Sequence, residues 1–299
     1  MAFLVGLFSG VLFVSPVRQS QVASKTSAKV ILTGDVMLGR TVMIKSQEVN
    51  DPIYPFRKVA DRLREADIVF INLENPIIEN CPRHETGFKF CASPELVQGL
   101  VFAGVDVVNL ANNHAGNYGQ KGLEGTKRIL EENGIRITGL GNLTIEPSFA
   151  KASEGKQFSS KIGFLGFNLV DRKLSELDLK LIRESDIKVD VLVVGVHWGV
   201  EYTSGPTNSQ KLIAKSLVEA GADVIAGHHP HWAQDMEYVN GKPVYYSLGN
   251  FVFDQMWSEK TRQGLVVRLT IEGDKIVKEE RLPIYMKEWA QPEFLPHEP

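Results

Sequence analysis

The sequence is poor in cysteine and in net charge, and both shortages limit what the protein can be. Only two of its 299 residues are cysteine, and the formal net charge is −3 with acidic and basic residues interspersed. This balance leaves no broad basic surface and no acidic tail, so we expect no nucleic-acid partner. The chain also lacks a Gly/Ser-rich linker and an internal repeat, which favours one large domain. A hydrophobic content of 43% is ordinary for a globular protein with a sizeable core.

The two cysteines, Cys81 and Cys91, are separated by the polar segment PRHETGFKF. They do not form a zinc site with His84, because a fourth ligand is missing. In an exported protein the pair can close a small disulfide loop. In a cytoplasmic protein both remain reduced thiols, so the pair alone does not decide the compartment.

The chain begins with a short apolar run at residues 2–14 (AFLVGLFSGVLFV). Its length suits the core of a signal peptide rather than a membrane-spanning helix, with Val22-Ala23-Ser24 as a candidate cleavage site. Basic residues follow the run and none precedes it, which is the reverse of the usual bias of a signal segment. We interpret residues 1–28 as a signal or anchor segment and expect an extracytoplasmic protein, secreted or membrane-anchored. The alternative is a cytoplasmic protein with an N-terminal extension.

From residue 29 onward, short β-branched apolar runs alternate with segments of helical period, a pattern typical of an α/β sheet. The predicted strands are 29–33, 67–71, 105–110, 135–138, 161–167, 190–196, 223–226, 235–239, 243–247 and 264–272. The predicted helices lie near 55–65, 94–103, 119–133, 175–185 and 207–220. The Val239-Asn240-Gly241-Lys242 turn predicts a hairpin, so we expect mixed sheets with antiparallel strands late in the chain. Periodicity is lost after Ile284, so we expect a domain at 29–285 and a tail at 286–299.

Five of the apolar runs end in residues able to bind a metal or transfer a proton. These residues are Asp35, Glu74, Asn112-Asn113-His114, His197 and His228-His229-Pro230-His231. Functional groups of an open α/β sheet lie beyond the carboxyl ends of its strands, so we expect these side chains to converge at one edge. Five of the seven histidines fall at such ends. The other two, His84 and His297, lie in a loop and in the tail, and we assign them no role.

Each of these residues also has a purely structural interpretation. Asp35 after a glycine can stabilise a turn, and Glu74-Asn75-Pro76 can be the start of a loop. Asn112-Asn113 can cap the helix that begins near Tyr118. A lone histidine such as His197 is more often a hydrogen-bonded core residue than a ligand. Five independent coincidences at five strand ends are nevertheless harder to account for than one site, and we favour the site.

The residue types indicate which chemistry such a site performs. Imidazole, carboxylate and amide groups offer nitrogen and oxygen ligands without a thiolate, which suits Mn, Fe or Zn and excludes an iron–sulfur centre. A hydrolytic site with two divalent ions needs a carboxylate able to bridge ions about 3.5–4 Å apart. A histidine beside the ions, but not bound to them, can protonate the leaving group. The sequence therefore predicts a dinuclear hydrolase-type site.

Six motifs along the chain resemble those of the CapA (poly-γ-glutamate capsule biosynthesis) family, in the same order. They are Gly34-Asp35-Val36-Met37, Asn72-Leu73-Glu74, Asn109-Leu110-Ala111-Asn112-Asn113-His114, His197-Trp198-Gly199-Val200-Glu201-Tyr202, Gly227-His228-His229-Pro230-His231 and the segment from Tyr245 to Asp254. The resemblance covers residues 29 to 272. That family is similar to the calcineurin-like metallophosphoesterases, which implies an α/β fold in the form of a two-sheet αββα sandwich with mixed sheets around a dinuclear site.

The resemblance also implies roles for individual residues. The implied metal ligands are Asp35, Glu74, Asn113, His197, His229 and His231. Glu74 is then the bridging carboxylate, and His114 is the general acid. The implied residues around the ligands or the substrate are His228, Glu201, Asn250 and Asn112, of which Glu201 and Asn250 can equally have ordinary hydrogen-bonding roles.

Two residues depart from the expected pattern. Met37 stands where the wider superfamily has a histidine, and a thioether is a poor ligand for a hard divalent ion. Asn117 stands where the CapA pattern usually has Asp before Tyr-Gly, which removes a carboxylate from the site.

Three functions are therefore in competition. The first is a metal-dependent hydrolase at the cell envelope that supports synthesis of poly-γ-glutamate or another polyanionic polymer, with the polymer or a phosphorylated substrate and membrane-bound synthesis machinery as partners. The second, motivated by Met37 and Asn117, is a non-catalytic envelope component that contains metal and binds a polyanion. The third is a cytoplasmic phosphoesterase without a role in capsule synthesis.

Overall fold

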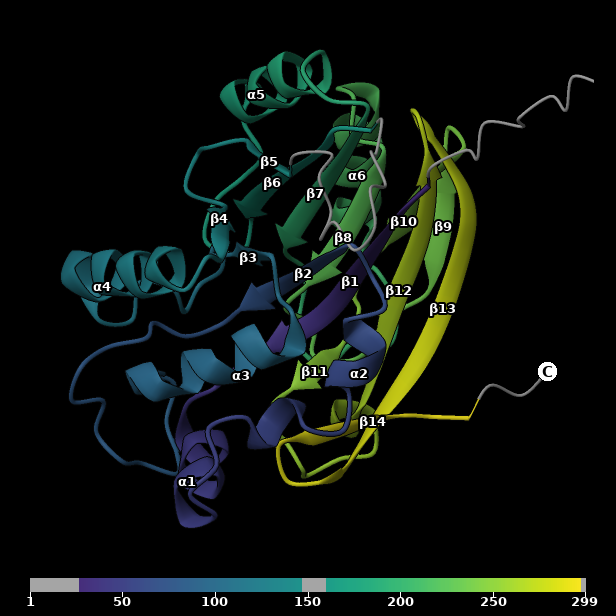
Figure 1. Ribbon diagram of the computed structural model, residues 1–299. Coiled ribbons are helices and arrows are strands. Elements are labelled where there is room, and N and C mark those ends of the chain that lie inside the picture. The colour runs from purple at the N-terminus through teal and green to yellow at the C-terminus, as the bar shows by residue number, and fades with distance from the viewer. Residues whose placement is uncertain (1–26, 147–159, 297–299) are drawn as a thin grey trace, which may run out of the picture.

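Two β-sheets packed face to face form the centre of the computed structural model, which describes residues 27–146 and 160–296 (Figure 1). The first sheet has the strand order β14-β13-β12-β1-β2-β3-β4, with β11 also paired to β1, and the second has the order β5-β6-β7-β8-β10-β9. The strands of the first sheet are β1 (Ala28–Val36), β2 (Ile68–Leu73), β3 (Val107–Asn109), β4 (Arg136–Thr138), β11 (Asn250–Val252), β12 (Gln263–Glu272), β13 (Lys275–Glu288) and β14 (Gln291–Phe294). Those of the second are β5 (Thr144–Glu146), β6 (Ile162–Asn168), β7 (Val191–His197), β8 (Val224–His228), β9 (Met236–Val239) and β10 (Lys242–Tyr245).

Helices cover the outer face of each sheet. The α-helices are α1 (Arg40–Glu48), α2 (Ala60–Leu63), α3 (Val97–Ala103), α4 (Gly119–Glu132), α5 (Glu176–Asp186) and α6 (Asn208–Glu219). Short 3₁₀ turns lie at Tyr54–Phe56, Pro94–Leu96 and Lys260–Arg262. In Figure 1 α1, α2 and α3 lie on the side of the first sheet, whereas α5 and α6 lie on the side of the second.

The alternation of side chains along each strand produces these layers, because successive residues point to opposite faces. In β1, Val30 and Leu32 pack between the two sheets, whereas Ile31 packs toward the helices of the first sheet. In β7, Val193 packs between the sheets and Val194 packs toward α5 and α6. Strands covered on both faces read as continuous apolar runs, which is why the sequence pattern identified them. The expected αββα sandwich with mixed sheets is confirmed.

Most neighbouring strands at the centre of each sheet are paired in parallel. Strands β1, β2, β3 and β4 run parallel to one another, as do β6, β7, β8 and β10. The carboxyl ends of each set therefore lie at one edge of their own sheet. The predicted hairpin is also confirmed: β9 and β10 are antiparallel around Asn240 and Gly241, whose φ angles of 49° and 78° match a two-residue turn of type I′.

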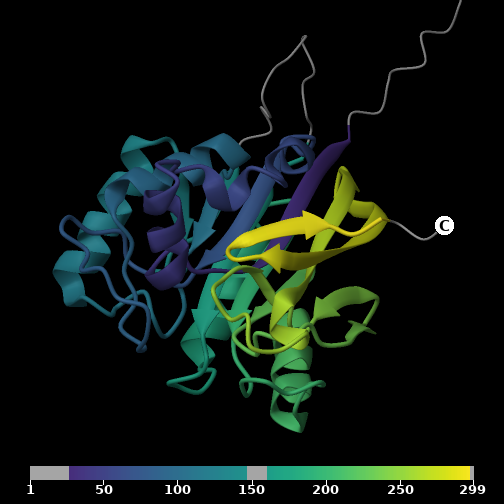
Figure 2. The same cartoon turned by 90° about the horizontal axis from the view of Figure 1, so that it is seen from below.

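The expected tail at 286–299 is wrong for residues 286–294. Strand β13 continues to Glu288 and pairs with β14 in antiparallel register (Figure 2). Leu282, Ile284 and Met286 are buried at alternate positions, as in any strand with one covered face. Pro283 and the charged residues before it hid this alternation. Helix α1 was also missed, because it starts soon after β1 and no side chain caps its first turn.

Two features bear on whether the protein is exported: the cysteine pair and the N-terminal segment. Cys81 and Cys91 are joined in a disulfide. The predicted signal or anchor segment lies outside the described residues, apart from its last two positions. Within residues 27–146 and 160–296, none of the helices combines the length and apolar character needed to cross a bilayer.

Candidate metal centre

Buried acidic and histidine side chains from both sheets meet at the carboxyl ends of the central strands. Asp35 lies near the end of β1, Glu74 follows β2, and His197 and His228 end β7 and β8. Gly34 allows this convergence, since a Cβ there would lie 2.1 Å from the carbonyl oxygen of Gly249. The amide of Asp35 donates to that same carbonyl at 2.9 Å, which fixes the end of β1.

One group of possible ligands consists of Asp35, Glu74 and His197. One ligand atom from each lies within 4.8 Å of the others, and all three side chains are fully buried. The Oε1 atom of Glu74 is 3.7 Å from Nδ1 of His197. Asn113 adds an oxygen to this group, because its Oδ1 lies 2.8 Å from Nε2 of His197.

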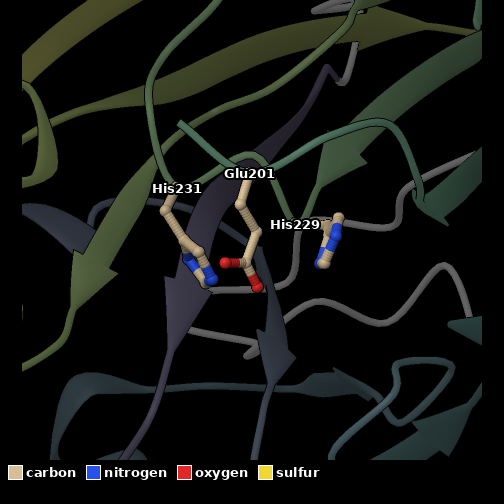
Figure 3. Close-up of side chains that lie close together, drawn as sticks. All are labelled: Glu201, His229 and His231. Atoms are coloured by element: carbon tan, nitrogen blue, oxygen red, sulfur yellow. The ribbon is translucent and has the colours of Figure 1, made fainter. Parts of the chain in front are cut away.

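A second group consists of Glu201, His229 and His231, again with one ligand atom each within 4.8 Å. Figure 3 shows the Glu201 carboxylate between the two imidazole rings. His229 and His231 have φ angles of 94° and 59°, so both lie in the left-handed region that non-glycine residues rarely adopt. Such strain is maintained where surrounding structure requires it, often at functional sites.

The two groups are in direct contact. Nδ1 of His231 lies 3.3 Å from Oδ2 of Asp35, and the rings of His197 and His229 are 4.8 Å apart. His228 does not belong to either group, but its Nδ1 lies 3.1 Å from Oδ1 of Asp35. The six ligands implied by sequence therefore lie together, and the surrounding residues orient them.

Asn72 connects the carboxylates, a feature that the sequence did not assign. Its Nδ2 donates to Oδ1 of Asp35 at 2.9 Å and to Oε1 of Glu74 at 3.1 Å. Its Oδ1 accepts from Asn109 at 3.1 Å and from Asn112 at 3.2 Å. All four contacts fix the amide in one orientation and hold two carboxylates from different strands side by side. The available signal was a polar residue inside the apolar run of β2.

The remaining predicted residues have clear positions. Asn112 donates to the carbonyl oxygen of Leu73 at 2.8 Å, and its Oδ1 accepts from the amide of His114. Asn250 places its Oδ1 2.9 Å from Nδ1 of His231. Glu201, expected in the pocket with either a direct or a supporting role, lies among the possible ligands.

The two histidines without an expected role lie elsewhere in the chain. His84 lies in the loop closed by the disulfide, where its Nδ1 is 2.8 Å from the carbonyl oxygen of Pro82. His297 is outside the described residues.

His114 lies at the edge of the centre. Its Nε2 is 3.4 Å from Nδ2 of Asn113, and its Nδ1 is 3.2 Å from Oδ1 of Asn117. Burial lowers the pKa of the His114 imidazole below its usual value. Met37 is fully buried, and its sulfur accepts from the amide of Gly39 at 3.0 Å.

The buried polar atoms of the centre are suited to binding divalent cations. Oε2 of Glu74 and Nε2 of His228 are buried without a hydrogen-bond partner among the described residues. Burial and the nearby Asp35 carboxylate raise the pKa of Glu74 well above its usual value. Burial opposes ionisation of Asp35 too, but hydrogen bonds from His228 and His231 keep its pKa well below the usual value. Two adjacent buried carboxylates need compensating positive charge, and a bound cation provides it.

Comparison with known proteins gives a consistent set of similarities. Residues 29–255 match the profile of a family described as "Bacterial capsule synthesis protein PGA_cap". The chain is 33% identical over 272 residues to the PGA biosynthesis protein CapA of Bacillus subtilis, covering 85% of this chain and 70% of that protein. It is 33% identical over 281 residues to the capsule biosynthesis protein CapA of Bacillus anthracis, covering 85% and 66%. Among solved structures, TT1561 of Thermus thermophilus has a TM-score of 0.49 and 13% identity, with 86% and 98% covered.

Proposed function

The chain belongs to the bacterial capsule synthesis protein PGA_cap family, and on this basis we propose that it is a metal-dependent hydrolase with a phosphoesterase-type site. Its role is to support synthesis of poly-γ-glutamate or a related polyanionic polymer at the cell envelope. The observation that carries the enzymatic part is the contact between two groups of possible ligands, one around Asp35 and one around His231. The names of the two Bacillus relatives support the proposed role in polymer synthesis.

The proposed ligands are those that sequence implied, with one addition. They are Asp35, Glu74, Asn113, His197, His229 and His231, together with Glu201. Two divalent ions, Mn, Fe or Zn, would supply acidified water and neutralise charge on a phosphoryl or similar oxyanion. Glu74 would be the carboxylate that holds both ions, because its Oε1 contacts Asn72 while its Oε2 has no protein partner among the described residues.

The protein's own residues orient the reaction. His114 is placed to donate a proton to the leaving group, since the imidazole lies beside Asn113 without belonging to either ligand group. Oδ1 of Asn117 accepts a hydrogen bond from Nδ1 of His114, which fixes the orientation of the imidazole. Asn72 holds the Asp35 and Glu74 carboxylates in place, which preorganises the ligands.

Metal dependence is the direct test of this proposal. We expect purified protein to contain about two divalent ions per chain and to hydrolyse a generic aryl phosphodiester or monoester. Stripping the metal with a chelator should abolish hydrolysis, and reloading with Mn, Zn or Fe should restore it. Metal analysis and the assay are carried out on the same sample. Hydrolysis that survives complete stripping, or protein that takes up none of these ions, contradicts the proposal.

The envelope location is supported by the disulfide. Disulfides persist in oxidising compartments and are rare in the cytosol, so the Cys81–Cys91 bond favours export over the cytoplasmic alternative. Cell fractionation distinguishes the two locations.

The second candidate, a non-catalytic component that binds a polyanion, is favoured by two lysines near the centre. Lys260 lies 4.5 Å from the ring of Trp232, which follows His231, and Lys89 lies 4.4 Å from the ring of Tyr118. Both lysines are exposed, and neither forms a salt bridge within residues 27–146 and 160–296. Trp257, which precedes Lys260 in the same loop, is 61% exposed. Its ring packs edge-on against that of Tyr202, with ring centroids 4.9 Å apart. A polyanion can bind here with or without turnover.

Reversing the charge of Lys260 is expected to weaken binding of poly-γ-glutamate fragments. The Lys260→Glu change removes an attraction and adds a repulsion, so the dissociation constant should rise roughly 5- to 10-fold at low salt. Isothermal titration calorimetry on metal-loaded protein measures it. The matched control is Lys275→Glu, an exposed lysine at the other end of the β12–β13 hairpin. Equal losses in both variants would show a nonspecific charge effect and rule out a local binding surface.

A further inference from the structure

The disulfide closes a loop that reaches the candidate general acid. Cys81 and Cys91 are bonded, and Phe90, the residue before Cys91, is buried. The Phe90 ring stacks on the imidazole of His114, with centroids 4.1 Å apart and planes 29° from parallel. An aromatic ring at this distance restricts rotation of the imidazole.

The side-chain amide of Asn117 joins the loop backbone to the same histidine. The amide of Phe90 donates to Oδ1 of Asn117 at 2.7 Å, and that oxygen lies 3.2 Å from Nδ1 of His114. Asn117 accepts at this atom, so Nδ1 donates to it, and Nε2 on the side of Asn113 is the nitrogen that would carry the proton for the leaving group. The residue that departs from the family pattern therefore links the loop to the imidazole.

A partly buried arginine holds the other part of the loop. The Arg40 guanidinium lies 4.5 Å from the centre of the Phe90 ring, and its Nη1 donates to the carbonyl oxygen of Gly87 at 2.9 Å. Its Nε donates to Asp254 at 3.1 Å, and the Asp254 side chain is only 4% exposed. Phe253, next to Asp254, lies 4.9 Å from the ring of His231. The loop therefore contacts His114 directly and is linked through Arg40 to the segment that packs against His231.

The rest of the loop contributes little packing of its own. Residues 85–89 are exposed, and Phe88 is 76% exposed. The base is held by backbone hydrogen bonds of Ala92 with Pro76 and Ile78. A loop with so few buried contacts gains order mainly from its closure, which the disulfide supplies by limiting the open conformations.

We propose that the disulfide-closed loop 82–90 is a positioning element for His114, in which Phe90 is the positioning residue and the Cys81–Cys91 bond holds Phe90 against the imidazole. This inference rests on the proposed function, in which His114 donates a proton. It gives the disulfide a role in turnover rather than in stability alone.

Substitutions in the loop test the proposal in the full, metal-loaded protein. We expect Phe90→Leu and the double variant Cys81→Ser/Cys91→Ser each to lower kcat by roughly 10- to 100-fold, because small misplacements of a catalytic group have effects of this size. KM and metal content should stay near the wild-type values. Phe90→Tyr, which keeps the stacked ring, should retain most of the activity. Phe88→Leu is the matched control, since Phe88 belongs to the same loop but is exposed, and it should have no effect.

A second measurement does not depend on turnover. Diethyl pyrocarbonate modification of His114, followed by mass spectrometry, reports how firmly the imidazole is held. The modification rate should rise in Phe90→Leu and in the double serine variant but not in Phe88→Leu. This readout tests the loop even if wild-type protein hydrolyses no ester, an outcome that would defeat the proposed function alone.

Two results would overturn the inference. The first is an unchanged His114 modification rate in Phe90→Leu. The second is loss of bound metal in that variant, because the loop would then act on the ligands rather than on His114. If the double serine variant does not fold, Phe90→Leu carries the test with the disulfide intact.

Discussion

Replacing His114 with alanine is expected to lower turnover by about 10²–10⁴-fold, the usual contribution of a general acid. The imidazole lies next to Asn113, yet it is in neither group of possible ligands. Removing it should therefore leave metal content unchanged, and the loss should be in kcat rather than in KM. Steady-state kinetics and metal analysis on the same preparation measure both quantities.

His84→Ala is the matched control, because His84 lies in the disulfide loop and has no role in the proposed reaction. It should behave as the wild type. Binding of poly-γ-glutamate fragments separates the two leading functions: His114→Ala should keep its affinity for the polymer while losing turnover. Full activity in His114→Ala would remove this residue from the mechanism, and absence of turnover in the wild type together with tight polymer binding would favour the non-catalytic component.

Replacing Glu74 with glutamine should change stability in opposite directions with and without metal. Wild-type protein should gain about 2.7 kcal/mol at a metal concentration 100 times the dissociation constant, which is a rise in Tm of roughly 5–10 °C. Glu74→Gln should lose this gain, since a neutral amide is a poor bridging ligand. Without metal the variant should melt at a higher temperature than the wild type, because one of two adjacent buried carboxylates is gone.

The difference in metal-free protein should depend on pH. Burial raises the pKa of Glu74 above its usual value of 4.5, so folding favours the protonated form. A raised carboxyl pKa contributes stability that is present below pH 4.5 and is lost as pH rises toward the pKa of the folded state. The advantage of Glu74→Gln should therefore increase with pH above 4.5.

Glu79→Gln is the control, an exposed carboxylate soon after Glu74 in the chain. It should alter neither the metal-dependent rise in Tm nor the pH dependence. Calorimetry or thermal melts with and without chelator provide all of these values. A metal-dependent rise in Tm that survives in Glu74→Gln would exclude Glu74 as a bridging ligand.

Most of the fold was predictable from the sequence because the central strands are covered on both faces. Such strands appear as continuous apolar runs, and the run before Asp35 and the run before His197 identified β1 and β7. Strands β5 and β11, of three residues each, were not predicted, whereas β3 and β4 are equally short but lie in predicted runs. Strand β13 was not among the predicted strands, because a proline and a series of charged residues mask its alternation.

The candidate site was predictable for a different reason. Parallel strands in one sheet place their carboxyl ends at the same edge, so we expected ligands at the ends of separate runs to lie near one another. The packing of the two sheets then brought the ends of β1 and β2 to those of β7 and β8. That argument covered Asp35, Glu74, His197 and the segments 112–114 and 228–231, and the family motifs then assigned six ligands among them. The assignment of these residues as ligands remains a prediction for metal analysis to test.

The sequence by itself determined the α/β layers and the set of residues that converge, because both follow from the period and the ends of apolar runs. Only the tertiary structure decided which atoms touch: the contacts of Asn72 with two carboxylates, the position of Glu201 between two histidines, and the stacking of Phe90 on His114. These contacts join segments far apart in the chain through side-chain directions and distances of a few ångströms. Such distances are fixed when the two sheets and the disulfide-closed loop pack together, and no local pattern of residues encodes them.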